Sequence, residues 1–191
     1  MKNKKLSISW GKYPKHNSEI EYFNKQSLDY KSESIPYGNG RSYGDSCIAN
    51  RVIDMRLEKH FISFNEKKGI LVVQSGVLLD DIIKVFVPKG WFLKINPGTK
   101  YITVGGAIAA DIHGKNHHLE GCFSECVNWM KLLIANNNII KSSEEENIDY
   151  FRSTCGGMRL TGIILEVEIQ LKRITSKNIK QTTVKTKNLL E

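Results

Sequence analysis

The alternation of hydrophobic and polar positions is clearest over residues 163–171, where Ile, Leu and Val alternate with Glu and Gln. A period of two over this length predicts a strand with one buried face. Shorter runs rich in β-branched and aromatic residues predict further strands. The predicted strands span residues 35–37, 51–55, 60–65, 69–75, 127–135, 139–141, 163–171 and 182–186.

Helical spacing is strongest between Leu78 and Val87, where apolar residues recur at intervals of three and four before Pro88 and Gly90. This pattern predicts an amphipathic helix that ends at the proline. Strands and helices mix without a regular strand–helix–strand alternation, which predicts the α+β fold class. Shorter helices are predicted at residues 19–30, 103–111 and 147–154.

With 191 residues the chain has the size of one domain, which we expect to form two lobes, roughly residues 1–66 and 67–172. No apolar run approaches the roughly 20 residues that span a bilayer, and no apolar stretch follows the basic residues 1–5. We therefore expect a cytoplasmic protein without a secretory signal. The four cysteines are scattered and form no CxxC motif, so reduced thiols are expected.

The formal net charge of +8 comes mostly from lysine. Such an excess fits an anionic partner, such as a nucleotide, a lipid phosphate or a membrane surface, and it also fits a chain that is simply rich in solvated lysines. We favour the second interpretation for the lysines in general. Basic and aromatic residues do not interleave as they do on a stacking surface, so nucleic acid is not expected as a partner.

Two glycine-rich loops lie about sixty residues apart, the first at residues 38–45 and the second at residues 97–118. Glycine lets backbone N–H groups approach an anion and tolerates the positive φ angles of an anion-binding nest. In the first loop, Arg41, Ser42 and Tyr43 add a phosphate partner, a hydrogen-bond donor and a ring for stacking. The loop does not match the dinucleotide fingerprint GxGxxG, because Tyr43 stands at its last position and no strand–loop–helix unit surrounds it.

The second loop contains the predicted helix 103–111, whose N-terminus would face the same ligand and favour an anion. His113 and His117 have the i,i+4 spacing of a zinc site, but Gly114 disfavours a helix between them, so no metal is expected. A third glycine cluster follows at residues 156–162. Together these loops indicate a large phosphorylated ligand that is held from both sides.

Four segments together resemble the PCMH-type FAD-binding domain of the vanillyl-alcohol-oxidase superfamily. Within it, the first-loop and histidine-rich segments are similar to the branch of decaprenylphosphoryl-ribose oxidases and related bacterial FAD-linked sugar oxidases. The similarity covers roughly residues 8–172, which suits a single domain. The segments are GRSYGD at 40–45, PGT at 97–99, TVGGAIA at 103–109 and DIHGKNHH at 111–118.

The resemblance implies an α+β domain of two lobes with FAD between them. Residues 36–46 would wrap the pyrophosphate, and Gly98 with residues 103–106 would contact the pyrophosphate and ribityl chain. Residues 113–116 would lie near the ribityl chain and isoalloxazine ring, and Ile163 would offer backbone contacts to the ring or the adenine side. The residues assigned to FAD in this way are Pro36, Tyr37, Gly38, Asn39, Gly40, Arg41, Ser42, Tyr43, Gly44, Asp45, Ser46, Gly98, Thr103, Val104, Gly105, Gly106, His113, Gly114, Lys115, Asn116 and Ile163.

Relatives that link the flavin covalently use a histidine in the first loop, where this chain has Ser42 and Tyr43, so non-covalent FAD is expected. The branch usually shows the pattern Gly-Gly-x-Gly-Leu-Thr-Gly, and in residues 156–162 of this chain Arg159 replaces one glycine. At a position that needs positive φ, an arginine is strained. Two consequences stay open: Arg159 alters the flavin contacts, or it binds phosphate.

The resemblance implies the FAD-binding part of an oxidoreductase that oxidises a sugar CH–OH group and is inactive alone. We expect that the substrate domain of these oxidases lies outside this chain together with the catalytic residues, and that residues 173–191 begin a linker or the first strand of that domain. The favoured substrate is a polyprenyl-phosphate-linked pentose in cell-envelope polysaccharide synthesis, met by the full-length protein at a membrane surface. The alternatives are an aldonolactone or alditol oxidase domain, a flavin subunit that joins a separate substrate subunit, and a non-enzymatic basic module that binds an acidic partner.

Overall fold

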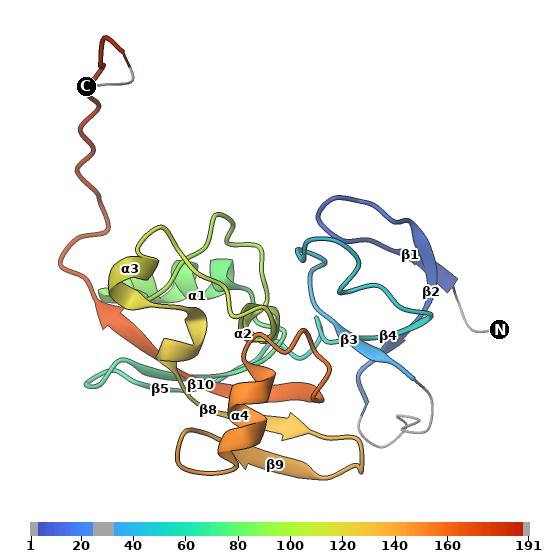
Figure 1. Cartoon of the computed structure of the whole chain (residues 1–191). Helices are drawn as coiled ribbons and strands as arrows, with labels where there is room; N and C mark the ends of the chain where they lie inside the picture. Colours follow the sequence, from blue (N-terminus) through green and yellow to red (C-terminus); the bar gives the residue numbers. More distant parts are fainter. Residues whose placement is uncertain (1–3, 25–32, 189–191) are drawn as a thin grey trace.

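The computed structural model describes residues 4–24 and 33–188, and within them the chain forms two β-sheets in two neighbouring lobes (Figure 1). In the first sheet β1 and β2 pair antiparallel, whereas β2 and β3 both lie parallel to β4. Its four strands, in the order β1-β2-β4-β3, are β1 (Lys4–Ser7), β2 (His16–Tyr22), β4 (Arg51–Asp54) and β3 (Ile35–Tyr37).

Strand β4 is buried along its whole length because it is an inner strand of this sheet and also touches the second lobe. Successive side chains of a strand point to opposite faces. Val52 therefore packs with Cys47 inside the first lobe, whereas Ile53 packs with Leu133 and Ile163 of the second. The lobes thus meet through apolar contacts at β4.

The second sheet is antiparallel and has the order β5-β6-β10-β8-β9, with β7 paired to the C-terminal end of β10. Along β10 the side chains of Val167, Ile169 and Leu171 are buried in the main core and the polar residues between them are partly exposed, which confirms the predicted period of two over residues 167–171. Before Glu166 the prediction is wrong, because the pairing with β8 shifts register between Ile164 and Glu166, and Ile163 packs between the lobes while Ile164 lies in the main core. The strands are β5 (Phe61–Asn65), β6 (Ile70–Gln74), β7 (Trp91–Leu93), β8 (Val127–Leu133), β9 (Ile139–Ser142) and β10 (Ile163–Arg173).

Short helices cover the second sheet, with α1 and α2 over one of its faces (Figure 1). Helix α1 buries Leu79, Ile82 and Phe86 in the main core, as its apolar spacing predicts. No helix among the described residues has the length and apolar character that a bilayer span requires. The helices are α1 (Leu79–Phe86), α2 (Val104–Ala109), α3 (His117–Glu120) and α4 (Ile148–Thr154), with 3-10 turns at Val87–Lys89 and Phe123–Cys126.

The α+β class is confirmed, but two predicted elements are wrong. Residues 19–22 of the predicted helix 19–30 belong to β2, because Ile20 pairs with Val52 of β4. Residues 25–30 of that prediction lie outside the described residues. The predicted strand 182–186 is an exposed irregular segment that pairs with no strand in the described part of the chain.

The boundary between the sheets falls between β4 and β5. The predicted first lobe, residues 1–66, includes β5, but β5 pairs with β6 and so extends the second sheet. Its apolar residue Phe64 packs against the main core beside the aromatic rings of Phe86 and Trp91. The assignment of residues 1–172 to one FAD-binding domain stays a prediction.

Candidate functional site

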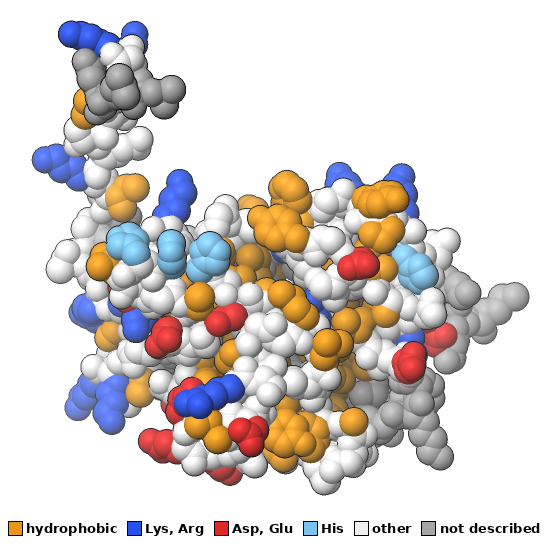
Figure 2. All heavy atoms as spheres, viewed as in Figure 1, with side chains coloured by type: hydrophobic (Ala, Val, Ile, Leu, Met, Phe, Trp, Pro, Cys, Tyr) orange, Lys and Arg blue, Asp and Glu red, His pale blue; other side chains and the backbone are white. Residues whose placement is uncertain are grey.

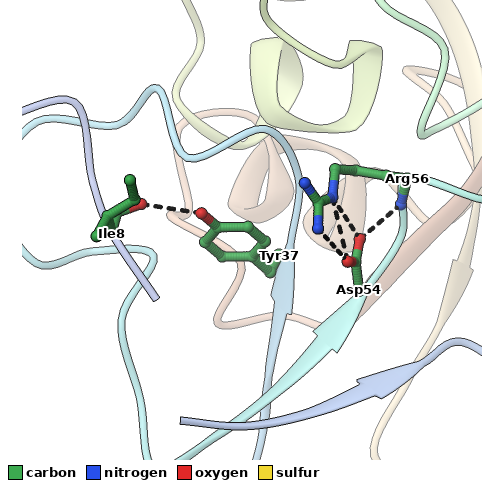
Figure 3. Close-up of polar contacts among 4 residues, drawn as sticks. All are labelled: Ile8, Tyr37, Asp54 and Arg56. Atoms are coloured by element: carbon green, nitrogen blue, oxygen red, sulfur yellow. Dashed lines mark hydrogen bonds and ion pairs between the residues drawn. The ribbon is translucent and has the colours of Figure 1, made fainter. Parts of the chain in front are cut away.

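Strand β3 delivers the first glycine loop to the junction of the lobes. Its last residue, Tyr37, is buried, and the hydroxyl donates a 2.9 Å hydrogen bond to the Ile8 carbonyl oxygen (Figure 3). Burial, followed by the nearby Cys47 thiol, raises the pKa of Tyr37, so the phenol stays neutral. The Arg56 guanidinium lies 5.8 Å from the centroid of the Tyr37 ring, within the range of a cation–π interaction.

Asp54, the last residue of β4, holds Arg56 in this position. Its buried carboxylate accepts hydrogen bonds from the Arg56 backbone N–H at 3.0 Å, from Nε at 2.9 Å and from Nη2 at 2.5 Å (Figure 3). These hydrogen bonds raise the pKa of Arg56. A forked arginine–carboxylate pair is geometrically specific, so it fixes the end of β4 beside the base of the glycine loop.

The first glycine loop contains backbone N–H groups that have no hydrogen-bond acceptor in the described chain. Within residues 4–24 and 33–188, no acceptor is found for the backbone N–H groups of residues 38–42. Gly40 has φ of +59°, and a Cβ there would lie 2.5 Å from the Ile8 carbonyl oxygen, so only glycine fits. A loop with unsatisfied N–H groups and a residue of positive φ is the geometry of an anion-binding nest.

The start of α2 differs in this respect from the prediction. Thr103 caps the helix, because its Oγ1 accepts a 3.1 Å hydrogen bond from the Gly106 N–H. The N–H of Val104 donates to the Val77 carbonyl oxygen and that of Gly105 to the Ser75 carbonyl oxygen, both at 2.8 Å. The N–H groups of the first turn are therefore satisfied within the protein, and anion binding falls mainly to the first loop and to side chains.

The two predicted glycine loops meet at Gly38 and Thr103. A Cβ on Gly38 would lie 2.5 Å from Thr103 Oγ1, which shows how closely the backbone of one loop approaches the other. One residue further on, Asn39 Nδ2 donates a 2.9 Å hydrogen bond to the Tyr101 carbonyl oxygen. Segments about sixty residues apart in sequence thus form one surface.

Two adjoining hollows open between the lobes, and Gly38, Thr103, Gly106 and Arg159 line both of them. We call the pair the interlobe cleft. Figure 2 shows hydrophobic side chains gathered along this junction. The first hollow is mostly apolar, while the second is bounded by the polar first loop. Lining residues that sequence reasoning missed are Met55, Ser75, Ile102, Ala109, Ala110, Ile112, Thr154, Gly162 and Ile164.

A third hollow lies at the histidine-rich part of the second loop, and it contains the predicted residues Gly98, His113, Gly114, Lys115 and Asn116. Gly114 approaches its neighbours closely, because a Cβ there would lie 2.7 Å from the Asn96 carbonyl oxygen. The lysines of this hollow are Lys94, Lys115 and Lys172, of which sequence reasoning found one.

The three histidines of the second loop do not form a metal cluster. Their rings follow one another at centroid distances of 5.5 Å and 6.0 Å from His113 to His117 to His118, and histidine side chains gather over α3 in Figure 2. Helix α3 begins at His117, so the i,i+4 pair does not share one helix. In the described part of the chain, no three metal-binding side chains come together.

Several predicted site residues lie outside the three hollows. Val104 is buried in the main core, and Ile163 packs in the contact between the lobes, because it points opposite to its neighbour Ile164 in β10. Tyr43 is 82% exposed and meets the ring of Trp10 edge-on at 5.8 Å. Gly44 and Asp45 are exposed, and Ser46 is partly exposed.

Comparison with known proteins now gives the family. Residues 12–143 match the family described as FAD binding domain. The chain belongs to this family. Both predicted glycine loops fall within the matched residues, whereas Arg159 lies beyond them.

Relatives of the chain have names that describe oxidoreductases. Decaprenylphosphoryl-beta-D-ribose oxidase of Mycolicibacterium smegmatis is 41% identical over 140 residues, which cover 72% of this chain and 30% of the relative. L-gulonolactone oxidase of Mus musculus is 27% identical over 136 residues, 70% of this chain and 30% of the relative. D-lactate dehydrogenase of Anaerostipes hadrus is 25% identical over 125 residues, which cover 63% of this chain and 26% of the relative. The chain thus spans about a third or less of the length of these relatives.

The residues of the interlobe cleft fit FAD. A pyrophosphate needs unsatisfied donors, and residues 38–42, whose N–H groups have no acceptor in the described chain, line the second hollow together with the cationic Arg41 and Arg159. The absence of a side chain at Gly38 is what allows this backbone to approach Thr103 Oγ1 so closely. The adjoining hollow is lined mostly by apolar groups.

Proposed function

We propose that the chain is the flavin-binding part of an FAD-dependent oxidoreductase that oxidises a CH–OH group of a sugar. The observation that carries this proposal is the meeting of the two glycine loops at Gly38 and Thr103, where unsatisfied N–H groups border an apolar hollow. An extended dinucleotide has a charged pyrophosphate at its centre and an aromatic ring at each end, so it matches a polar loop that adjoins an apolar hollow.

Bound FAD would supply the hydride acceptor for oxidation of the alcohol. The chain's own residues bind and orient it. The N–H groups of residues 38–42, with Arg41, hold the pyrophosphate, and the Thr103–Gly106 segment forms the opposite wall. The loop from His113 to Asn116 lies by the ribityl chain and ring, with Lys115 as a cationic group at that end.

Attachment of FAD is non-covalent in this proposal. Residues 36–46 contain no histidine, and the exposed Tyr43 does not line the interlobe cleft. The histidines of the second loop belong to the hollow of Lys115 instead. The protein would therefore lose its flavin on unfolding.

The favoured substrate is a polyprenyl-phosphate-linked pentose used in cell-envelope polysaccharide synthesis. The name of the 41% identical relative supports this class. Lys115 lines the hollow of the histidine-rich loop together with Lys94 and Lys172, which lie 3.9 Å and 3.6 Å from carboxylate oxygens of Glu120. The enzyme would act in the cytoplasm, with the full-length protein at the membrane surface that carries such lipids. Catalytic residues would come from the part of the relatives that this chain does not cover.

A second substrate class is an aldonolactone or alditol. The similarity to L-gulonolactone oxidase supports it. Phosphate in the substrate separates the two classes, because only a phosphate-bearing substrate offers Lys115 an anionic partner. If a pentose phosphate competes with a substrate analogue for binding to the full-length enzyme and an aldonolactone does not, the first class is favoured.

A visible absorption spectrum of the purified chain, recorded before and after addition of FAD, tests the function. We expect a bound-flavin spectrum that disappears from the protein fraction on denaturation. Flavin that stays attached after denaturation would overturn non-covalent binding. No bound flavin with FAD in excess, in a chain that is folded by circular dichroism, would contradict the proposal for this chain.

A further inference from the structure

Arg159 stands in a backbone conformation that arginine rarely adopts. Its φ is +74°, and the preceding Met158 has φ of +49°. Both lie in the left-handed region, which is strained for a residue with a Cβ and free of strain for glycine. Strained backbone is retained where the surrounding structure or a function requires it. The interactions of the Arg159 side chain must therefore offset this cost.

The side chain crosses from the second lobe to the first glycine loop. Nη2 donates a 2.8 Å hydrogen bond to Ser42 Oγ, and Nη1 donates a longer one, 3.3 Å, to the Ser46 carbonyl oxygen. These two acceptors are 117 and 113 residues away in sequence. A guanidinium has five N–H donors, so these neutral acceptors leave part of its capacity unused.

The positive charge of Arg159 is not balanced by the protein. Among the residues that the structure describes, no carboxylate forms an ion pair with it. Burial lowers the pKa of Arg159, and the titratable groups that act on it are the Cys47 thiol and the Tyr37 phenol. Burial raises the pKa of both, so they stay neutral near pH 7. A desolvated, unpaired guanidinium is costly without a counter-ion.

The same side chain is one of the residues that line both hollows of the interlobe cleft. The second hollow also contains the first loop, whose N–H groups at residues 38–42 have no acceptor within the described chain. An uncompensated cation and a row of unused donors thus face one space from opposite lobes. An anion in that space would satisfy both.

We propose that Arg159 binds the pyrophosphate of FAD from the second lobe, opposite the N–H groups of the first loop, so that the bound phosphates join the two lobes. This inference rests on the proposed function, since it assumes that FAD occupies the cleft. Guanidinium groups bind phosphate through paired hydrogen bonds, and lysine does not reproduce that fork. Binding of the phosphate offsets the free-energy cost of the strained backbone and of the desolvated guanidinium, which is uncompensated in the ligand-free chain.

The test measures the affinity of the chain for FAD and for riboflavin, which lacks phosphate, in Arg159→Gly, Arg159→Lys and wild type. We expect R159G to weaken FAD binding at least about tenfold, the loss of a charge-assisted hydrogen bond, and to leave riboflavin binding unchanged. R159K should fall between the two. The melting temperature of ligand-free R159G should equal or exceed that of wild type, because glycine relieves the strain at φ of +74°.

Arg152 of α4 gives a matched control. It lies seven residues before Arg159 in the sequence, is exposed, and forms an ion pair with Glu144. R152A should bind FAD like wild type. FAD affinity in R159G equal to or above that of wild type would overturn the proposal, and so would an equal loss of FAD and riboflavin affinity. A wild-type chain that binds no FAD would overturn the proposed function itself, which separates the two failures.

Discussion

Gly38 lies against Thr103 so closely that a Cβ on Gly38 would come within 2.5 Å of Thr103 Oγ1. The same Oγ1 accepts the hydrogen bond from the Gly106 N–H that caps α2. One contact therefore joins the first glycine loop to the beginning of the helix in the other lobe.

Gly38→Ala should disturb this contact. The added methyl would displace Thr103, which is 3% exposed and has little room to move. We expect a loss of about 1–3 kcal/mol in the free energy of unfolding, as for overpacking, together with weaker FAD binding. Urea unfolding and an FAD titration measure both. Gly11→Ala is the control, since nothing lies within 4 Å of its added Cβ, and it should change stability by no more than about 0.5 kcal/mol.

Thr103→Ala removes the N-cap of α2. The half-buried Gly106 N–H would lose its acceptor, so the free energy of unfolding should fall by about 1 kcal/mol. Thr103→Ser keeps the hydroxyl and should retain most of that stability. Denaturant unfolding of the three proteins decides the point, because equal losses in both variants would assign the effect to the lost methyl group and not to the cap.

The sequence predicted what depends on local pattern and missed what depends on distant partners. The alternation over residues 167–171 of β10 and the spacing of α1 were sufficient to predict both elements, because each of these segments buries one face. The strand β2 was missed because residues 16–22 have few apolar positions and are held by pairing with β4. Residues 182–186 show the converse, since a β-prone composition makes no strand without a neighbour.

The candidate site divides in the same way. Glycine spacing located both loops, and the resemblance brought them to one ligand. Ser75 and Thr154 line the cleft through the course of the chain in three dimensions, and no motif signals them. The N–H groups at the start of α2 were expected to favour an anion, but Val77 and Ser75 supply carbonyl oxygens that occupy them. Sequence alone does not reveal which donors are already satisfied.

The cysteines should react slowly in the folded protein. Burial raises the pKa of Cys126 and of Cys155 to about 12, and it is also the main cause of the raised pKa of Cys47 and Cys122. The thiolate is the reactive form. Alkylation with iodoacetamide near pH 8 should therefore be slow in the native chain and complete for all four thiols after unfolding. Rapid native labelling of Cys155 would contradict the raised pKa.

The raised pKa values of Cys126 and Cys155 predict that the protein becomes less stable at alkaline pH. In the unfolded state the thiols ionise near pH 8.5 (about the ordinary value), whereas in the fold Cys126 and Cys155 stay protonated up to about pH 12. Because the unfolded state loses these protons at lower pH, ionisation stabilises it relative to the folded state as the pH rises. Their contribution to stability is fully present below about pH 8.5 and is lost as the pH rises towards 12. In Cys155→Ala the fall in the free energy of unfolding between pH 8 and pH 10 should be smaller than in wild type.

Arg41 and Lys115 should each contribute to FAD affinity through charge. Both are exposed, Arg41 on the interlobe cleft and Lys115 at the histidine-rich loop, so we expect about threefold weaker binding in R41A and in K115A. High salt should reduce the difference from wild type, because exposed charges are screened. Lys67→Ala, in the exposed turn between β5 and β6, is the control for net charge. Unchanged affinity in both R41A and K115A would count against the assignment of FAD.

The Asp54–Arg56 pair should matter to stability more through its buried member than through its exposed one. The side chain of Arg56 is 47% exposed, whereas that of Asp54 is fully buried. Arg56→Ala therefore leaves a buried carboxylate without its guanidinium. We expect a loss of about 2 kcal/mol, below the value for a fully buried pair because solvent already screens Arg56.

A double variant separates this effect from the loss of the Arg56 side chain. In Asp54→Asn with Arg56→Ala the uncompensated charge is gone, so at neutral pH the double variant should be more stable than R56A alone. Urea unfolding of wild type, both single variants and the double variant completes the cycle. If the double variant were as unstable as the sum of the single ones, the carboxylate and the guanidinium would not be coupled, and the pair would not be what fixes the end of β4 beside Tyr37.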